Sequence, residues 1–115
     1  MIAVIFEVRP AEGKLDAYLG IAKTLREELE GLDGFLSVER FSSLSEDGKY
    51  LSLSFFRDEA AVQAWRNTAS HRAAQQAGRN GILSTYRLRV ASVLRDYGMD
   101  ERHEAPDDSK AVHTN

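Results

Sequence analysis

The sequence predicts an α+β fold in which four antiparallel strands form one sheet and two helices cover one of its faces. Three observations lead to this prediction. Strand-like and helix-like hydrophobic patterns follow one another in the order βαββαβ over residues 2 to 96. The chain has 115 residues, which suits one domain with one core. It is 43% hydrophobic and 29% charged, as ordinary globular proteins are, and no apolar run approaches the roughly 20 residues of a membrane helix.

The first half of the chain predicts a strand, a helix and a second strand. Residues 2 to 8 are mostly β-branched or aromatic, and their alternation places Ile2, Val4, Phe6 and Val8 on one face. From about residue 14 to residue 30, apolar side chains recur at helical spacing, which predicts an amphipathic helix packed on the sheet. Residues 35 to 43 alternate again and predict the second strand.

A hairpin joins the second strand to the third. Residues 45 to 49 are polar and contain a glycine, so they suit a turn. Residues 50 to 56 alternate cleanly, and we expect Leu51, Leu53 and Phe55 to face inward, with Ser52 and Ser54 outward.

The second helix is expected to contain a break. Asp58 suits its N-cap, Trp65 lies on its apolar side, and the pattern is interrupted near Asn67-Thr68 before it resumes toward Gly78. A fourth strand is predicted over about residues 83 to 96, where two sets of side chains alternate. These sets are Tyr86, Leu88, Val90 and Ser92 against Arg87, Arg89, Ala91 and Val93.

Together these elements give the ferredoxin-like βαββαβ arrangement over residues 1–97, followed by a polar tail at residues 98–115. Both helices lie on one face of such a sheet, so the other face is bare. Several strands nevertheless carry apolar residues on both faces, as Ala3 and Ile5 do opposite Val4 and Phe6. We therefore predict a homodimer through the open sheet face.

Charge is distributed unevenly along the chain. The net charge is −3, yet residues 60 to 95 contain six arginines and no acid, while both flanking segments are acidic. The arginines either pair with acids of the domain or a partner subunit, or they bind an anionic ligand. Because the chain is acidic overall and has no RNA-binding consensus, nucleic acid is not expected as a partner.

Several classes of site are excluded by residue content. The chain contains no cysteine, so it has no disulfide, thiolate metal site or cysteine nucleophile. No metal-ligand constellation, phosphate-binding glycine loop or hydrolase triad is present, and no metal is predicted. Residues 1 to 6 are apolar and lack the charged leader of a secretory signal, so we expect a cytoplasmic protein without a membrane segment.

The segment from Ser52 to Asn67 combines a strand, a short acidic turn and a helix bearing Trp65, and it is followed by His71, Arg72 and Gln75. This pattern resembles the antibiotic biosynthesis monooxygenase domain family over about residues 1–97. The resemblance implies a dimeric α/β barrel with a pocket in each subunit between the sheet and the helices. It also implies oxygenation without a bound cofactor, or haem degradation in one branch of the family.

The haem-degrading branch uses an Asn on the first strand and a His about ten residues after the helix Trp. Here those positions hold Glu7 and Gln75, while His71 lies six residues after Trp65. On a continuous helix His71 would point away from the ten-residue position, although the break at Asn67-Thr68 changes that geometry. Haem is therefore kept as the alternative cofactor and no cofactor as the main expectation.

Six residues are candidates for the site. His71 suits a general base, since an imidazole titrates near neutral pH, while Trp65 would shape an apolar cavity and Arg72 would stabilise an anion. Each also has a structural reading, as a capping His, a core Trp and an ion-paired Arg. The expected substrate-binding residues are Glu7, Gln75 and Tyr86, and the alternatives are that Glu7 faces solvent at the dimer rim and that Tyr86 packs in the core.

The first functional hypothesis is a small monooxygenase that oxidises a phenolic or quinol-like aromatic substrate with O₂ and no cofactor. The second is a haem-binding or haem-degrading protein in which the arginines meet the propionates. The third is a non-catalytic ligand-binding or stress-related dimer in which Trp65 and His71 are structural.

Overall fold

The computed structural model describes residues 1–112, without the side chains of residues 69, 70, 111 and 112. Residues 113–115 of the predicted tail lie outside the described residues. The elements in chain order are β1 (Ile2–Pro10), α1 (Leu15–Leu29), β2 (Phe35–Ser42), β3 (Tyr50–Phe56), α2 (Glu59–Arg66), α3 (Ala69–Ala77), a wide turn η1 (Gly78–Ile82), β4 (Leu83–Ser92) and α4 (Asp107–Val112).

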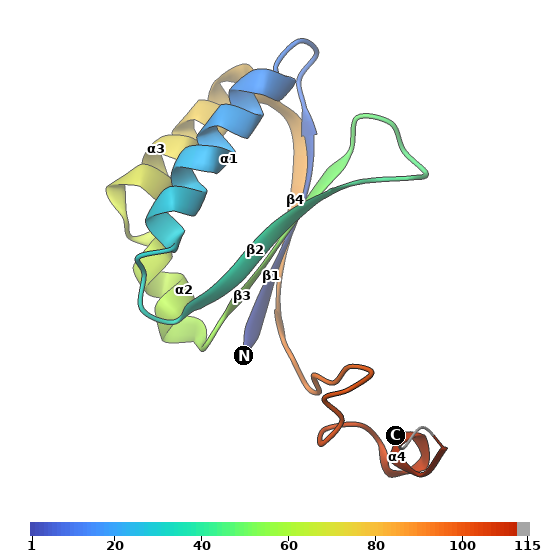
Figure 1. Ribbon diagram of the computed structural model, residues 1–115. Helices are drawn as coiled ribbons and strands as arrows, with labels where there is room; N and C mark the ends of the chain where they lie inside the picture. The colour runs from blue at the N-terminus through green and yellow to red at the C-terminus, as the bar shows by residue number, and fades with distance from the viewer. Residues whose placement is uncertain (113–115) are drawn as a thin grey trace.

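The strands form one antiparallel sheet in the order β2-β3-β1-β4. Figure 1 shows α1, α2 and α3 together on one side of this sheet, so the ferredoxin-like prediction is confirmed. The side without helices is called the open face below. Among the residues that the structure describes, no helix is both long and apolar enough to cross a lipid bilayer.

The core lies between the helices and the sheet. Val4 of β1 pairs with Ser54 of β3, and Ser54 pairs with Val38 of β2, so these side chains share the helix-facing side. Val4, Val38 and Phe56 belong to the buried cluster, and Trp65 packs against it. The cluster is completed by Leu29, Ala61 and Val62.

The expected orientation of β3 is wrong. Phe56 is fully buried and Ser54 is 5% exposed, both on the side of the helices. Leu51, Leu53 and Phe55 therefore point to the open face. The predicted alternation is correct. When both faces of a sheet carry apolar residues, however, alternation alone does not show which face the helices cover. In the middle of this strand the leucines face outward and the serines face the helices, which makes the open face more apolar than the sequence suggested.

The fourth strand ends earlier than predicted, at Ser92, and its helix-side residues are poorly covered. Tyr86, Leu88 and Val90 are about half exposed. Because β4 is an edge strand, helices α2 and α3 leave this margin of the sheet uncovered.

Gly34 allows the loop before β2 to approach α2 closely. Its φ of +88° lies in the left-handed region, and a Cβ built there would lie 2.6 Å from the Cβ of Ala61. The carbonyl of Gly34 also accepts a hydrogen bond of 2.7 Å from the backbone of Arg57. This contact ties the start of β2 to the residue that follows β3.

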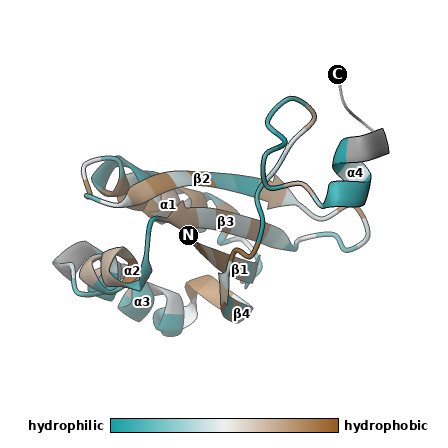
Figure 2. Cartoon of the chain, turned by 90° about the horizontal axis from the view of Figure 1, so that it is seen from below, coloured by the Kyte–Doolittle hydropathy of each residue, from teal (hydrophilic) through white to brown (hydrophobic). Residues whose placement is uncertain are grey.

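The segment after β4 leaves the domain. Figure 1 shows it running away from the helices to α4, and Figure 2 shows that α4 is hydrophilic. Its hydrogen bonds include one of 2.8 Å from Gly98 to Glu101 and one of 3.0 Å from Ala105 to Arg102. The segment is thus folded on itself, and Ala105 is buried within it.

Candidate active site

The site is built around an aromatic group at the junction of α2 and α3. The ring of Trp65 stacks on Phe56 with centroids 5.8 Å apart, so the indole rests on the core of the domain. The imidazole of His71 meets the same indole edge-on, with centroids 4.2 Å apart. His71 therefore lies beside Trp65, although the two come from different helices.

The helix break brings these rings together. The chain leaves α2 after Arg66 and begins α3 at Ala69, with Thr68 as the N-cap. The Thr68 hydroxyl donates a hydrogen bond of 2.8 Å to the carbonyl of Trp65 and accepts one of 3.2 Å from the backbone N–H of His71. One side chain thus fixes the backbone at both ring-bearing residues.

Two polar atoms of this group have no partner. Trp65 Nε1 and His71 Nδ1 are buried, and neither has a hydrogen bond within the part of the chain that the structure describes. Leaving a buried polar group unpaired costs about 1–3 kcal/mol. The indole N–H is a donor, and the imidazole nitrogen can donate or accept, so both atoms retain unused hydrogen-bonding capacity.

Burial keeps the imidazole neutral. Desolvation lowers the pKa of His71 from its ordinary value of 6.5, a backbone hydrogen bond at Arg66 opposes this shift, and the charge of Arg66 adds to it. At pH 7 the side chain is therefore in the form that accepts a proton. The arginine whose charge acts on His71 is Arg66, which was not among the predicted site residues.

Arg72 has a different local role. Its guanidinium Nη2 donates to the side-chain oxygen of Asn67 at 3.4 Å, across the helix break. The segment rich in arginine therefore supplies two cations near the helix junction, Arg66 by its effect on the pKa of His71 and Arg72 by this contact. In the sequence, each arginine directly follows one of the two ring residues, Trp65 or His71. That adjacency is the feature from which both arginines could have been predicted as site residues.

The three expected substrate-binding residues are not brought together. Gln75 is exposed on α3. Tyr86 lies on the helix side of β4, where its ring contacts Phe6 with centroids 5.6 Å apart. Glu7 points to the open face, the opposite side of the sheet from Trp65.

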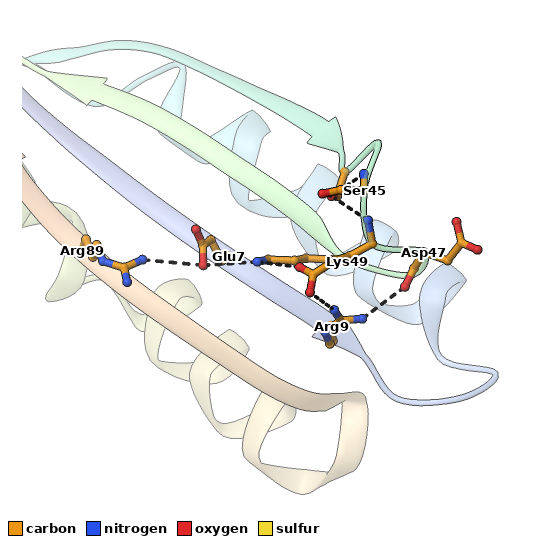
Figure 3. A network of polar contacts seen from close by, with 8 residues as sticks. Glu7, Arg9, Ser45, Asp47, Lys49 and Arg89 are labelled. Atoms are coloured by element: carbon orange, nitrogen blue, oxygen red, sulfur yellow. Dashed lines mark hydrogen bonds and ion pairs between the residues drawn. The ribbon is translucent and has the colours of Figure 1, made fainter.

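Glu7 belongs instead to a network of charges (Figure 3). Its Oε2 atom lies 3.7 Å from Lys49 Nζ and 3.6 Å from Arg89 Nη1. Lys49 also contacts Glu46 at 3.0 Å, and Glu46 contacts Arg9 at 3.2 Å. The residue at the haem branch's first-strand position is thus held in ion pairs on the open face.

No metal centre accompanies the aromatic group in residues 1–112, where no cluster of three or more His, Asp or Glu side chains could hold an ion. The residues of the aromatic group can transfer a proton at His71, stabilise negative charge through arginine and contact an aromatic molecule through Trp65.

Comparison with known proteins places this geometry in a family. The model of the antibiotic biosynthesis monooxygenase family matches residues 1–77. The jasmonate monooxygenase ABM of Pyricularia oryzae is 54% identical over 101 residues, which are 88% of this chain and 47% of that protein. The uncharacterized protein YqjZ of Bacillus subtilis is 37% identical over 62 residues, 54% of this chain and 53% of that protein. The chain spans about half the length of these curated relatives.

Solved structures agree with the fold. Rv0793 from Mycobacterium tuberculosis superimposes with a TM-score of 0.76 at 15% identity, covering 84% of this chain and 98% of that one. PA3566 from Pseudomonas aeruginosa gives a TM-score of 0.70 at 17% identity, covering 81% and 93% of the two chains. Because the family model matches residues 1–77, more than half of the chain, and the four-stranded sheet agrees with it, the chain belongs to the antibiotic biosynthesis monooxygenase family.

Proposed function

We propose that the chain is a monooxygenase that uses O₂ without a bound cofactor, with His71 as the general base. One observation carries this proposal: a neutral, half-buried imidazole lies against Trp65 with its Nδ1 atom unpaired. The lowered pKa keeps the imidazole neutral at pH 7, so the ring is ready to accept a proton from a substrate beside the apolar wall. The 54% identity with a protein named a monooxygenase supports the same class of reaction.

In the proposed reaction His71 takes a proton from the substrate, and the resulting anion is rich enough in electrons to reduce O₂. For a substrate with an activated CH₂ group, the CH₂ becomes C=O while O₂ supplies that oxygen atom and the oxygen of one water. The substrate provides all the electrons, so the protein has to supply only a base, a cation and an apolar surface. Trp65 provides the surface, and Arg66 or Arg72 stabilises the anion.

The substrate must therefore carry a proton whose loss gives a delocalised anion. A phenolic or quinol-like aromatic meets this requirement and would lie against the Trp65 indole. A relative is named for jasmonate, so the class to be tested extends beyond phenols.

The proposed enzyme is a homodimer. Ile5, Leu53 and Phe55 share the open face and are partly exposed, and covering such an apolar surface contributes about 25 cal/mol for each Å² buried. A second copy of the same face is the partner of matching shape and chemistry.

Oxygen uptake tests the catalytic proposal. The purified chain is incubated with a panel of anthrones, quinols, phenols and jasmonate, and turnover is compared between the wild type, His71→Gln and Arg66→Gln. We expect His71→Gln to lower kcat at least about 100-fold, the usual contribution of a general base. His103→Gln, on the exposed C-terminal segment, is the control and should retain full activity. Normal turnover by a correctly folded His71→Gln variant would refute the role of His71.

A further inference from the structure

Two unpaired charges of opposite sign lie on the two edges of the open face. We infer that they fix the orientation of the dimer: Glu39 on β2 of one protomer pairs with the partner's Arg87, and the two-fold axis repeats the contact. The inference rests on the homodimer proposed above and adds its arrangement and the residues that specify it. The register of the sheet places both side chains on the open face, and the ion pairs of the described residues include neither side chain.

Glu39 is the acid of the β2 edge. It lies opposite Leu53 in the register, next to Val38, whose side chain is buried on the helix side. Alternation along the strand therefore places the Glu39 carboxylate on the open face, where it is exposed. Within the described residues it makes no ion pair, and α1, α2 and α3 lie on the other side of the sheet.

Arg87 is the matching base of the β4 edge. It lies directly opposite Glu7, the acid expected to neutralise it. That acid is already engaged by Lys49 and Arg89, as Figure 3 shows. Arg87 is exposed, lines a cavity of about 230 Å³ at the hairpin end of the sheet and, in the described part of the chain, has no ion-pair partner.

The charges separate the two ways in which the open faces can meet. A two-fold axis parallel to the strands places β2 of one sheet over β4 of the other, so an acidic edge faces a basic edge twice. An axis across the strands places β2 over β2 and β4 over β4, so that the edge carrying Glu39 faces the same edge of the partner and the edge carrying Arg87 and Arg89 faces its own copy. Juxtaposed like charges oppose association, so the first arrangement is favoured.

The lengths involved are compatible with the proposed pair. Packed sheets lie about 10 Å apart, which a glutamate and an arginine can span together. Glu39 is at the level of Ile5 and Arg87 at the level of Glu7, two residues apart along the strands or about 7 Å. An offset of this size lies within the combined reach of the two long side chains.

The apolar and charged parts of the face have separate roles. Around Ala3 the neighbours across the sheet are Phe55 and Ala91, whereas around Glu7 they are Leu51 and Arg87. The first part supplies buried area, and the second supplies a pattern that only one orientation satisfies.

Charge reversal tests the inference. The variants are Glu39→Arg, Arg87→Glu and the double variant, with Arg79→Glu in the turn η1 as the control for an equal change of charge. Dimer dissociation constants are measured by analytical ultracentrifugation in 50 mM and 500 mM NaCl, with thermal unfolding as the check on folding. We expect each single variant to weaken the dimer about tenfold or more at low salt, the double variant to restore it to within about threefold, and Arg79→Glu to have no effect.

The outcomes are distinguishable. A wild-type protein that stays monomeric at all concentrations refutes the dimer and the pairing together. In another outcome the wild type dimerises, while the double variant loses as much free energy of dimerisation as the two single variants together, or more. That result would refute the pairing but not the dimer. Single variants with unchanged dissociation constants also refute the pairing.

Discussion

The pKa of His71 is a property of its neighbours rather than of its position in the sequence. The imidazole is partly buried against Trp65, so its charged form loses hydration, and the positive charge of Arg66 also disfavours it. Trp65 and His71 could be nominated from the sequence because the residue types suited the chemistry. Arg66 could not be told apart from the five other arginines of residues 60 to 95, because its effect depends on a fold that brings it near the ring.

The lowered pKa predicts a pH dependence of stability. Below the ordinary pKa of 6.5 the unfolded chain binds a proton at His71 that the folded chain resists, so the free energy of unfolding falls as the pH drops from about 6.5 through the lower, folded pKa. Above pH 6.5 His71 is neutral in both the folded and the unfolded chain, so the free energy of unfolding is not reduced by its protonation. His71→Gln should lack this component, which urea unfolding at a series of pH values would measure, with His103→Gln as the control.

The same shift predicts the acid limb of activity. The base is active when neutral, so kcat/KM should fall with decreasing pH at a midpoint below 6.5. A midpoint above 6.5 would contradict the neutral imidazole.

At the level of elements, most boundaries could be predicted because the hydrophobic patterns are strong and the breaks are local. The interruption at Asn67-Thr68 is confirmed, since α2 ends at Arg66 and α3 begins at Ala69. The orientation of β3 was predicted wrongly because an alternating pattern fits equally well with either set of side chains facing the helices. The register decides between the two orientations, since Ser54 pairs with Val4 and Val38, which are buried on the helix side. Glu7 was placed at the candidate site for a related reason, as its face could not be assigned to a pocket without the positions of the helices.

Thr68 predicts a link between helix capping and activity. Thr68→Ala removes the hydroxyl that bonds the backbone at Trp65 and His71, so it should lower the free energy of unfolding by about 1 kcal/mol. Because the backbone that positions the Trp65 and His71 rings also loses these hydrogen bonds, kcat should fall while KM changes less. Thr68→Ser keeps the hydroxyl and should retain most activity. Equal activity in Thr68→Ala and wild type would show that the cap does not position the site.

At the scale of the molecule, the C-terminal segment has contacts of its own and joins the end of the domain, where Glu104 accepts a hydrogen bond of 2.7 Å from the backbone N–H of Asp96. Arg102 lies at the centre of the segment, donating hydrogen bonds to Gly98 and Ser109 and contacting the ring of Tyr97. The polar composition indicated a tail, but it did not predict this internal order or the helix α4. These features depend on contacts between residues several positions apart.

Removal of residues 98–115 therefore should leave the domain folded. We expect the chain of residues 1–97 to unfold within about 4 °C of the full chain, which corresponds to no more than about 1 kcal/mol. Differential scanning calorimetry of the two proteins measures this. A much larger decrease would show that the segment stabilises the domain or its dimer.

The separate cap of α3 has a consequence for how relatives are aligned. Because α3 starts afresh at Thr68, the direction of His71 is set by its distance from Thr68 and not by the number of residues that separate it from Trp65. Counting along an unbroken helix would therefore misplace the histidine relative to the tryptophan. Evolutionary comparison across these proteins should be anchored on the capping threonine, whose hydroxyl bonds the backbone three residues before it and three residues after it.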